Sequence, residues 1–480
     1  MIIQTDMSLI NKKLYIGGRW IDSESKATID VFNPATGKKI AEIANGSKAD
    51  VLKAVHSARQ AFGPWSEKDP VLRAQFLRKI ADGLQSRSEE IVDLISLDVG
   101  MPRKMAKIMQ LGLPINILNY YADLVEKYSF EESHGDARVL SKPLGVAACI
   151  TPWNYPLFQI AAKVGPALGS GCTVVLKPSE VAPLATFVFA EIIDSINLPA
   201  GVFNLITGTG EEVGEVLVTS ADVDIVSFTG STQVGKRINQ LSAPTLKKVT
   251  LELGGKSASV VLKDADYEKA VKATVSSCFL NSGQTCLAQT RLIIPEEDYE
   301  ICANLAVSAV KNFTVGDPFD DSSKLGPLVS KIQQSRVRSL IDSAIHEGAE
   351  LLIGGSHLPI NLDGAGYYVL PTILGRVNPN SEIAQQEVFG PVLSILTYKT
   401  EQEALDIANN SQYGLSGAVW SRDIKKAQKF AEKIETGQIH INGGKFILDA
   451  PFGGWKNSGR GHELGLHGMQ EYMSYRTLLG

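Results

Sequence analysis

Short apolar runs alternate with amphipathic, helix-like segments between residues 144 and 252. The runs read GVAACIT, TVVLK, GVFNLIT, IVSFTG and VTLELG, and helical patterns begin near residues 156 and 184. Apolar runs of this kind, separated by helices, are typical of a parallel sheet covered on both faces. We therefore expect an α/β fold with a doubly wound sheet, which binds ligands at the carboxyl ends of its strands.

The pattern changes on either side of this region. Residues from about 48 to 125 read as helical, and a second α/β region follows the sheet, with strand candidates RLIIP, ELLIGG, VLSILTY and GQIHIN. The stretch 124–143 is polar and lacks a strong period, so we expect it to project from the core. A domain boundary is expected near residue 253.

Composition narrows the function classes. The 480 residues include 47 Lys and Arg against 52 Asp and Glu, for a formal net charge of -5. This length predicts two or three domains, and charges that form no blocks argue against nucleic-acid and membrane-surface partners. No apolar run approaches the roughly 20 residues of a membrane span. Because the first residues, MIIQTDMSLINKK, also lack a signal-peptide pattern, we expect a cytoplasmic protein.

One cysteine stands in an unusual setting. Cys286 follows small and polar residues in the stretch LNSGQTCLAQTR, which is poor core material. A thiol is a fair nucleophile at neutral pH, so Cys286 is a candidate covalent catalyst. The alternative, a buried inert cysteine, suits Cys149, Cys172 and Cys278. The five cysteines include no CxxC pair, which favours free thiols over disulfides or zinc.

A nucleophilic thiol needs helpers, and two polar residues beyond strand ends are candidates. Glu252 ends an apolar strand, where partial burial would raise its carboxyl pKa and suit it to act as a general base. Asn154, held between prolines in TPWNYP, is a candidate donor to an oxyanion. Each also has an ordinary interpretation, as a structural glutamate and as a turn residue. None of the seven histidines lies in a local signature of a cysteine hydrolase, although spatial pairing with Cys286 stays open.

Two glycine-containing turns could receive a pyrophosphate at the start of a helix. GTGEEVG, from Gly208 to Gly214, fits a surface turn equally well, whereas FTGSTQVG follows the run DIVSF and opens a helix. Both depart from the standard dinucleotide fingerprint in glycine spacing. Lys177 and Glu180, in KPSE at the end of TVVLK, could bind ribose hydroxyls or lie in a solvated loop.

Seven motifs occur in a recognisable order. PWNYP, KPSE, FTGST, LELGGK, GQTC, EVFGP and PFGGWKNSG have the order and spacing of the aldehyde dehydrogenase superfamily, which the chain resembles from IGGRWIDS to its terminal EY. The resemblance implies that Cys286 attacks an aldehyde to give a thiohemiacetal, whose oxyanion is held by the Asn154 side chain and the Cys286 backbone N–H. It further implies that hydride transfer to the nicotinamide leaves a thioester, and that Glu252 activates the water that hydrolyses it.

The resemblance also implies roles for further residues. Lys163 and Glu463 match positions proposed to relay protons away from the base, with an ordinary ion pair as the alternative. The implied cofactor-binding residues are Trp153, Lys177, Ser179, Glu180, Gly210, Gly214, Phe228, Gly230, Ser231, Leu253, Glu387 and Phe389. Since Glu180 would repel the 2′-phosphate of NADP and accept from a free hydroxyl, NAD is the expected cofactor. No metal is expected.

Members of this family have three parts, and the resemblance implies a corresponding division here. Residues 1–123 and 144–252 would form an NAD-binding, Rossmann-like domain, and residues 253–462 an α/β catalytic domain. Residues 124–143 and 463–480 would form a small β arm that pairs across subunits, which implies a homodimer or homotetramer.

The chain departs from the family pattern at three positions. Tyr155 replaces a commoner Phe, Leu287 follows the nucleophile where a small residue or a second cysteine is frequent, and His462 stands where Arg is usual. Leu287 adjoins the thiol and therefore bears on which aldehyde is the substrate, a question the sequence leaves open. Arg291 is the nearest candidate for binding an acidic substrate, with a structural role as the alternative.

Two other functions fit the same scaffold. A coenzyme-A-acylating relative would use the same thiol but characteristically lacks the glutamate found here at position 252. A catalytically silent structural protein is the second alternative, and the joint presence of Cys286, Glu252 and Asn154 argues against it. A cysteine hydrolase is disfavoured because the chain also carries a nucleotide-binding pattern.

Overall fold

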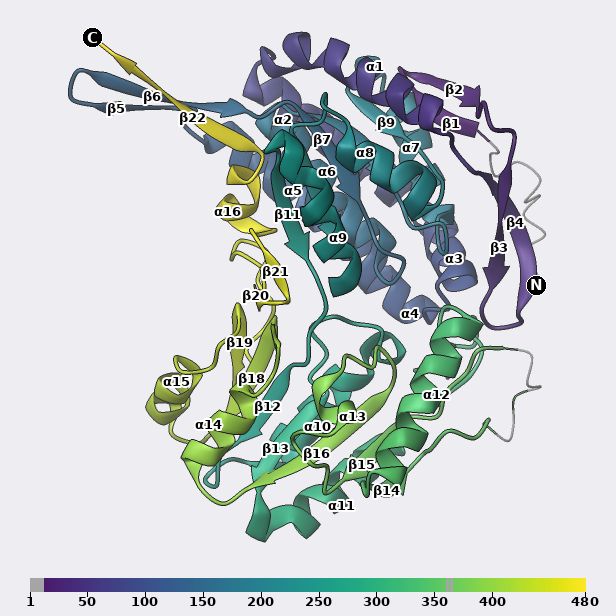
Figure 1. Cartoon of the computed structure of the whole chain (residues 1–480), viewed down its shortest axis with the longest axis vertical. Helices are drawn as coiled ribbons and strands as arrows, with labels where there is room; N and C mark the ends of the chain where they lie inside the picture. Colours follow the sequence, from purple (N-terminus) through teal and green to yellow (C-terminus); the bar gives the residue numbers. More distant parts are fainter. Residues whose placement is uncertain (1–12, 360–361, 363–365) are drawn as a thin grey trace.

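The computed structural model describes residues 13–359, 362 and 366–480. Residues 1–12, in which the sequence predicts no signal peptide, lie outside the described residues. Figure 1 shows two lobes, each built around a sheet. The chain passes from the first sheet to the second between β11 (Lys248–Glu252) and β12 (Ala258–Val261).

The first sheet has eight strands in the order β2-β1-β9-β8-β7-β10-β11-β21. Their bounds, besides β11, are β1 (Lys13–Ile16), β2 (Arg19–Asp22), β7 (Val146–Ile150), β8 (Thr173–Lys177), β9 (Phe203–Leu205), β10 (Ile225–Thr229) and β21 (Gly459–Arg460). The five predicted apolar runs form the five central strands, which pair in parallel. The predicted α/β fold with a doubly wound parallel sheet is confirmed.

Helices cover both faces of this sheet. One face carries α1 (Lys48–Ser66), α8 (Glu215–Thr219) and α9 (Thr232–Ser242). The other carries α2 (Pro70–Ser86), α3 (Ser88–Asp98), α5 (Leu113–Lys127), α6 (Pro156–Ser170) and α7 (Leu184–Ser195). The predicted helical region, about 48 to 125, is confirmed. Within it a π-helix, η2 (Lys107–Gly112), joins the short α4 (Arg103–Ala106) to α5.

The second sheet has seven strands in the order β14-β15-β16-β13-β12-β18-β19. Besides β12, they are β13 (Arg291–Pro295), β14 (Glu350–Ile353), β15 (Thr372–Gly375), β16 (Val392–Tyr398), β18 (Ser416–Trp420) and β19 (Gln438–Ile441). Its faces carry α10 (Tyr267–Phe279) and α11 (Tyr299–Val310) on one side, and α12 (Lys331–His346), α13 (Glu382–Gln385), α14 (Glu401–Asn409) and α15 (Ile424–Ala431) on the other. All four predicted strand candidates are strands of this sheet.

Smaller elements complete the chain. A hairpin of β3 (Thr28–Asn33) and β4 (Lys38–Ala44) lies near the amino terminus, and β17 (Tyr413–Gly414) pairs with β20 (Trp455–Lys456). Gly459–Arg460 returns to the first sheet and pairs antiparallel with β11, next to Glu252. The carboxyl-terminal region is therefore tied to the first sheet through β21 and to the segment before β18 through β17.

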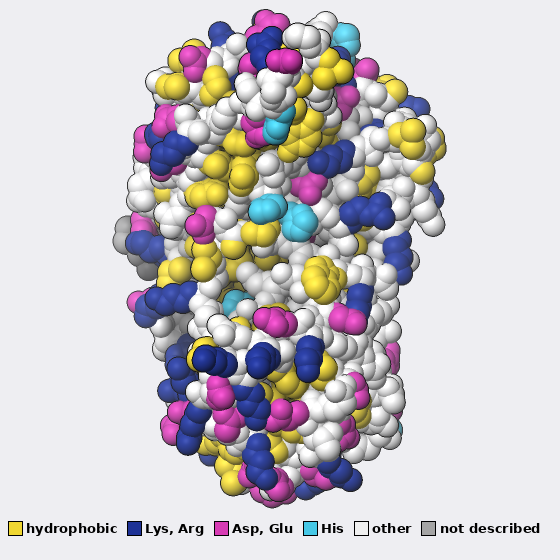
Figure 2. Space-filling view, turned by 90° about the vertical axis from the view of Figure 1, so that its left-hand side faces the viewer, with side chains coloured by type: hydrophobic (Ala, Val, Ile, Leu, Met, Phe, Trp, Pro, Cys, Tyr) yellow, Lys and Arg dark blue, Asp and Glu magenta, His cyan; other side chains and the backbone are white. Residues whose placement is uncertain are grey.

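A three-stranded sheet projects from the first lobe (Figure 1). It consists of β5 (Glu131–His134), β6 (Ala137–Pro143) and β22 (Met473–Leu479), which follows α16 (Gly465–Gln470). The stretch 124–143 therefore does project, but its first four residues complete α5. The face toward which this sheet points carries grouped apolar and histidine side chains across its middle, and charged side chains over the second lobe (Figure 2).

None of the helices in the described part of the chain combines the length and the apolar composition that a bilayer crossing requires.

Candidate active site

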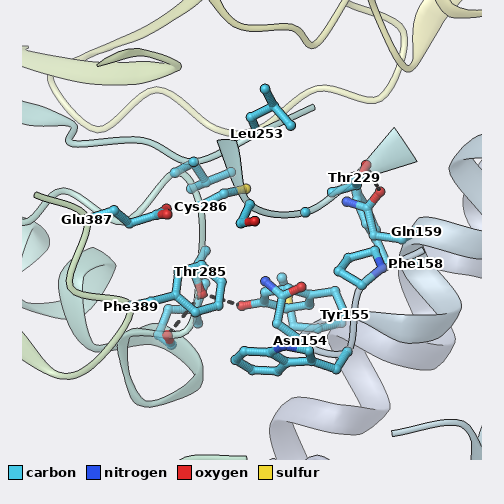
Figure 3. Close-up of a pocket in the computed structure, with 18 of the residues that line it drawn as sticks. Asn154, Tyr155, Phe158, Gln159, Thr229, Leu253, Thr285, Cys286, Glu387 and Phe389 are labelled. Carbon is cyan, nitrogen blue, oxygen red and sulfur yellow. Dashed lines mark hydrogen bonds between the residues drawn. The ribbon is translucent and has the colours of Figure 1, made fainter. Parts of the chain in front are cut away.

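A cavity of about 490 Å³ opens where loops from both sheets meet. Loops at the carboxyl ends of β7, β10 and β11 form one part of its wall, together with residues of η2, α5 and α6, and segments of the second lobe form the rest (Figure 3). Eight residues expected from the sequence line it: Trp153, Asn154, Gly230, Ser231, Leu253, Cys286, Glu387 and Phe389.

A left-handed turn leads the chain to Cys286. Asn281, Ser282 and Gly283 have φ values of 52°, 55° and 75°, a run that ordinary helical or extended backbone does not contain. A Cβ on Gly283 would lie 2.0 Å from the carbonyl oxygen of Gly390, so only glycine fits there. The turn leaves Cys286 partly accessible, whereas the other four cysteines are buried.

Hydrogen bonds tie this turn to the loop that carries Asn154. Asn154 Nδ2 donates to the carbonyl of Gln284 at 2.9 Å, and Asn281 Nδ2 donates to the Asn154 carbonyl at 3.1 Å. The Tyr155 hydroxyl lies 2.7 Å from Thr285 Oγ1, which is a contact that the commoner Phe could not make. The amide and the thiol are thus held on one rigid unit, although they lie far apart in the sequence.

Burial opposes ionisation of the thiol. It raises the pKa of Cys286 well above its usual range, and the carboxylates of Glu387, Glu252 and Glu463 raise it further. No cation appears among the groups that shift this pKa. The thiol is therefore the favoured form at neutral pH.

Glu252 ends β11 with a buried and unpartnered carboxyl group. Neither of its carboxyl oxygens has a hydrogen-bond partner among the described residues. Burial raises its pKa well above the usual value, and the Glu463 carboxylate adds to the shift while Lys163 opposes it. A carboxyl of raised pKa is suited to take up a proton near neutral pH.

Lys163 and Glu463 meet in the interior, 300 positions apart in the sequence. The Lys163 ammonium is fully buried and pairs with the Glu463 carboxylate. It also donates to Thr229 Oγ1 at 2.6 Å and to Gln159 Oε1 at 3.4 Å. Because Thr229 and Gln159 line the cavity (Figure 3), this network reaches from the buried ion pair to the site.

Lys177 ends β8, Ser179 and Glu180 follow it, and all three lie outside the cavity wall. Lys177 is buried, which lowers the pKa of its ammonium, and it donates to Glu180 Oε2 at 3.2 Å and to the Pro178 carbonyl at 3.0 Å. Gly214 faces the Lys177 stem, with 3.8 Å between an added Cβ and Cδ, and Gly210 borders open space. Both glycines belong to a π-helix, η3 (Gly210–Gly214).

Two groups in the cavity wall suit a dinucleotide. Ser231 caps the amino terminus of α9 by accepting from Val234 N at 3.3 Å, and the neighbouring Gly230 lies against the Phe228 ring so closely that a Cβ would come within 2.4 Å. A helix amino terminus of this kind receives phosphate. Glu387 Oε1 accepts from Gly255 N at 3.0 Å, and burial raises its pKa to about 7. The donors and acceptors present therefore fit NAD.

Several residues of the site were missed by sequence reasoning. These are Ile108, Met109, Leu113, Tyr155, Phe158, Gln159, Thr229, Leu280, Thr285, Gln333, Arg336, His440, Phe446 and Phe452. Gln159 stands four positions before Lys163 on α6, and Thr229 lies inside the motif FTGST, so both carried a usable signal. Among the described residues, no group of three or more His, Cys, Asp or Glu side chains is placed to hold a metal ion.

The model of the aldehyde dehydrogenase family matches residues 20–478 of the chain. The chain belongs to the aldehyde dehydrogenase family. This confirms the resemblance predicted from the seven motifs. The protein is also 42% identical, over 98% of both chains, to a 3-succinoylsemialdehyde-pyridine dehydrogenase from a Pseudomonas species.

Solved structures of aldehyde dehydrogenases share its fold. A Cys-to-Ala mutant of an aldehyde dehydrogenase from Pseudomonas syringae, complexed with NAD+ and octanal, is 42% identical with a TM-score of 0.96, over 97% of this chain and 96% of that one. A betaine aldehyde dehydrogenase from Staphylococcus aureus in complex with NAD+ is 35% identical with a TM-score of 0.95, over 98% and 95% of the two chains.

Proposed function

We propose that this aldehyde dehydrogenase oxidises an aldehyde to a carboxylic acid with NAD+, through a covalent intermediate on Cys286. The observation that carries the proposal is the joint placement of thiol and amide. Cys286 and Asn154 line one cavity, and the Asn154 amide is fixed by its bond to Gln284, two residues before the thiol. The solved relatives that bind NAD+ support the choice of cofactor.

The first half-reaction uses Cys286 as nucleophile. Its sulfur, once deprotonated, attacks the aldehyde carbon and forms a thiohemiacetal. The Asn154 amide carries a second N–H besides the one bonded to Gln284, and this N–H stabilises the oxyanion together with the Cys286 backbone N–H. When bound, NAD+ supplies the acceptor for the hydride that leaves the former aldehyde carbon.

The second half-reaction uses Glu252 as general base. Its unpartnered carboxylate takes a proton from water, and the resulting hydroxide attacks the thioester carbonyl to release the acid and regenerate Cys286. The network of Lys163, Glu463 and Thr229 then offers a route by which the proton moves away from Glu252.

The cofactor is held by residues of the first sheet and two of the second lobe. Lys177, Ser179 and Glu180, with Gly210 and Gly214 as nearby wall, bind the adenosine half. Gly230, Ser231 and Phe228 receive the pyrophosphate, while Trp153, Leu253, Glu387 and Phe389 surround the nicotinamide ribose and ring. Glu180 disfavours a 2′-phosphate, so kcat/KM is expected to be higher for NAD+ than for NADP+. A clear preference for NADP+ would overturn this assignment.

The domain division and assembly are part of the proposal. Residues 1–123 and 144–252 form the NAD-binding domain, 253–462 the catalytic domain, and 124–143 with 463–480 an arm that pairs across subunits in a cytoplasmic homodimer or homotetramer. Exposed Tyr475 and Leu479 on β22 support such pairing, because 59% and 83% of their surface is accessible in the single chain. A monomer by light scattering would contradict it.

The alternatives are less well supported. Coenzyme-A-acylating relatives characteristically lack a glutamate at this position, whereas Glu252 is present and its carboxyl is free of hydrogen-bond partners within the described residues. A silent structural protein has no use for a partly accessible thiol beside a fixed amide. The names of the relatives leave the substrate open, since they include a pyridine semialdehyde, betaine aldehyde and octanal.

Turnover by a cysteine variant tests the proposal. Reduced cofactor is followed by absorbance for purified protein with NAD+ and a panel of aldehydes. Cys286→Ala is expected to be inactive, whereas Cys302→Ala, which removes a buried thiol on α11, is expected to keep wild-type activity. Full turnover by Cys286→Ala would refute the covalent mechanism.

A further inference from the structure

The half of the cavity beyond Cys286 has an apolar wall. Figure 3 shows Glu387 and Phe389 on one side of Cys286 and Phe158 on the other. The wall on the Phe158 side is mostly apolar, with the uncharged polar side chains of Gln159 and Thr229 beside Phe158 (Figure 3) and with His440 in the same cavity lining. Its apolar members are Ile108, Met109, Leu113, Phe158, Leu287, Phe446 and Phe452.

Charged side chains are confined to the cofactor half of the cavity. Within the described part of the chain, the lining holds two of them, Arg336 and Glu387. Arg336 donates to the Glu387 backbone carbonyl at 2.8 Å, which keeps it beside the residue expected to bind the nicotinamide ribose. Neither group belongs to the apolar wall, so that wall offers no charge to an aldehyde tail.

Arg291, the candidate anchor for an acidic substrate, is engaged elsewhere. Its guanidinium is buried and donates to the carbonyls of Lys256, Ile407 and Ala408 at 2.8 to 2.9 Å. It does not line the cavity. Arg291 therefore joins β13 to neighbouring segments of its own lobe, and it is not available to bind a carboxylate of the substrate.

Aromatic rings continue along the apolar wall. The centroids of Phe158 and Phe446 are 6.4 Å apart, and those of Phe446 and Phe452 are 6.1 Å apart. Rings alone can hold a cation, but the rest of this wall is aliphatic, and its residues include no carboxylate. Burying a quaternary ammonium between aliphatic side chains without a counter-charge is unfavourable. Ile108, 64% exposed, extends the apolar surface to the solvent.

We propose that the apolar wall, defined by the seven residues above, selects uncharged hydrophobic aldehydes, aliphatic or aromatic, over anionic semialdehydes and cationic aldehydes. The inference rests on the proposed aldehyde oxidation, because it concerns the tail of the substrate of that same site. Each CH₂ that is added to the substrate tail and buried against the apolar wall is expected to raise kcat/KM about fourfold. This ratio corresponds to the transfer free energy of one buried methylene.

Two substitutions of matched exposure test the wall. kcat/KM is measured with NAD+ for propanal, hexanal, benzaldehyde, succinic semialdehyde and betaine aldehyde. The wild type should favour hexanal and benzaldehyde over both charged aldehydes by about 100-fold or more, the scale on which unpaired buried charge is rejected. Ile108→Arg should lower kcat/KM for hexanal and raise kcat/KM for succinic semialdehyde. Ile301→Arg, on α11 and 54% exposed, should leave the profile unchanged. Comparable kcat/KM for charged and neutral aldehydes would overturn the inference.

A binding measurement separates this inference from the proposed oxidation. Octanamide, an unreactive apolar analogue, should protect Cys286 from iodoacetamide, whereas succinate and choline at equal concentration should not. If no aldehyde is turned over, the proposed oxidation fails while the protection pattern still decides the ligand class. Protection by succinate or choline equal to that by octanamide would contradict the apolar selection.

Discussion

The Tyr155 hydroxyl and Thr285 Oγ1 lie 2.7 Å apart in the interior, on two loops that belong to different lobes. Thr285 in turn donates to the Leu280 carbonyl at 3.1 Å, so the tyrosine is the donor in the first bond. This chain of two bonds fixes the loop of the oxyanion amide against the loop of the nucleophile. Tyr155 therefore helps to align the Asn154 amide with the Cys286 thiol, and these two groups must act on the same substrate carbonyl.

Removing the Tyr155 hydroxyl tests this alignment. Tyr155→Phe is expected to lower the free energy of unfolding by about 1 kcal/mol, the net value of one hydrogen bond, as measured by urea denaturation. Tyr367→Phe is the control, because the hydroxyl of this partly exposed tyrosine makes no hydrogen bond within the described part of the chain. Equal stabilities of the two variants would show that the Tyr155 bond contributes nothing.

Gln110 anchors the helix that follows the Asn154 loop. It is fully buried on η2, and its Oε1 accepts from Leu157 N at 3.1 Å and Phe158 N at 3.4 Å. These amides belong to the first turn of α6, which has no side-chain cap from Tyr155. Gln110 therefore links one part of the apolar wall to the oxyanion loop.

Gln110→Leu is expected to destabilise the protein by about 1 to 3 kcal/mol, because it leaves buried amide groups without an acceptor. It should also lower kcat, since the start of α6 positions Asn154. Gln110→Glu keeps both acceptor contacts and should restore kcat, whereas Gln110→Met, which has a similar shape but no acceptor oxygen, should not. Stability and kcat are measured on the same preparations, and a Leu variant with both values unchanged would remove Gln110 from this role.

The pH dependence of thiol reactivity tests the electrostatics of the site. Because burial and carboxylates raise the pKa of Cys286, the thiolate fraction should grow as the pH rises through the alkaline range. The pKa of a free cysteine lies at about 8.5, so its alkylation rate levels off above that pH. The rate of alkylation of Cys286 by iodoacetamide should instead still increase above about pH 9. Glu252→Gln removes a negative neighbour and should move the profile to lower pH.

Glu191→Gln serves as the control for this shift. Glu191 is a carboxylate on α7 that pairs with Arg87 and is absent from the groups that affect Cys286. The pH profile of Cys286 alkylation in Glu191→Gln should coincide with that of the wild type. A Cys286 that is alkylated at a constant, maximal rate from neutral pH upward would contradict a raised thiol pKa.

Much of the fold could be predicted because burial leaves a direct trace in the sequence. The five central strands of the first sheet are buried on both faces, except for the partly exposed Lys248 and Val249 at the start of β11, so each reads as a largely apolar run. The sequence did not separate residues 124–127 from the polar segment that follows them. These residues complete α5, whereas the segment beyond them forms the projecting strands. The pairing of Gly459–Arg460 with β11 left no local pattern at all.

The site was only partly predictable for a physical reason. Cys286 stands out because its neighbours are poor core material, but Ile108 and Met109 have the same hydrophobicity whether they line a cavity or a core. The pairing of Lys163 with Glu463, like that of Tyr155 with Thr285, joins distant segments and depends on how the two lobes meet. Only the tertiary structure could therefore reveal the apolar wall.

A single-turnover measurement on Glu252→Gln tests the division of labour between thiol and carboxylate most directly. Stoichiometric enzyme is mixed with NAD+ and hexanal, reduced cofactor is counted per active site, and the acyl group on Cys286 is sought by mass spectrometry. One reduced cofactor per site followed by a stall, with the acyl group retained, is the predicted result. Sustained turnover at the wild-type rate, or no reduced cofactor in the first turnover, would contradict it.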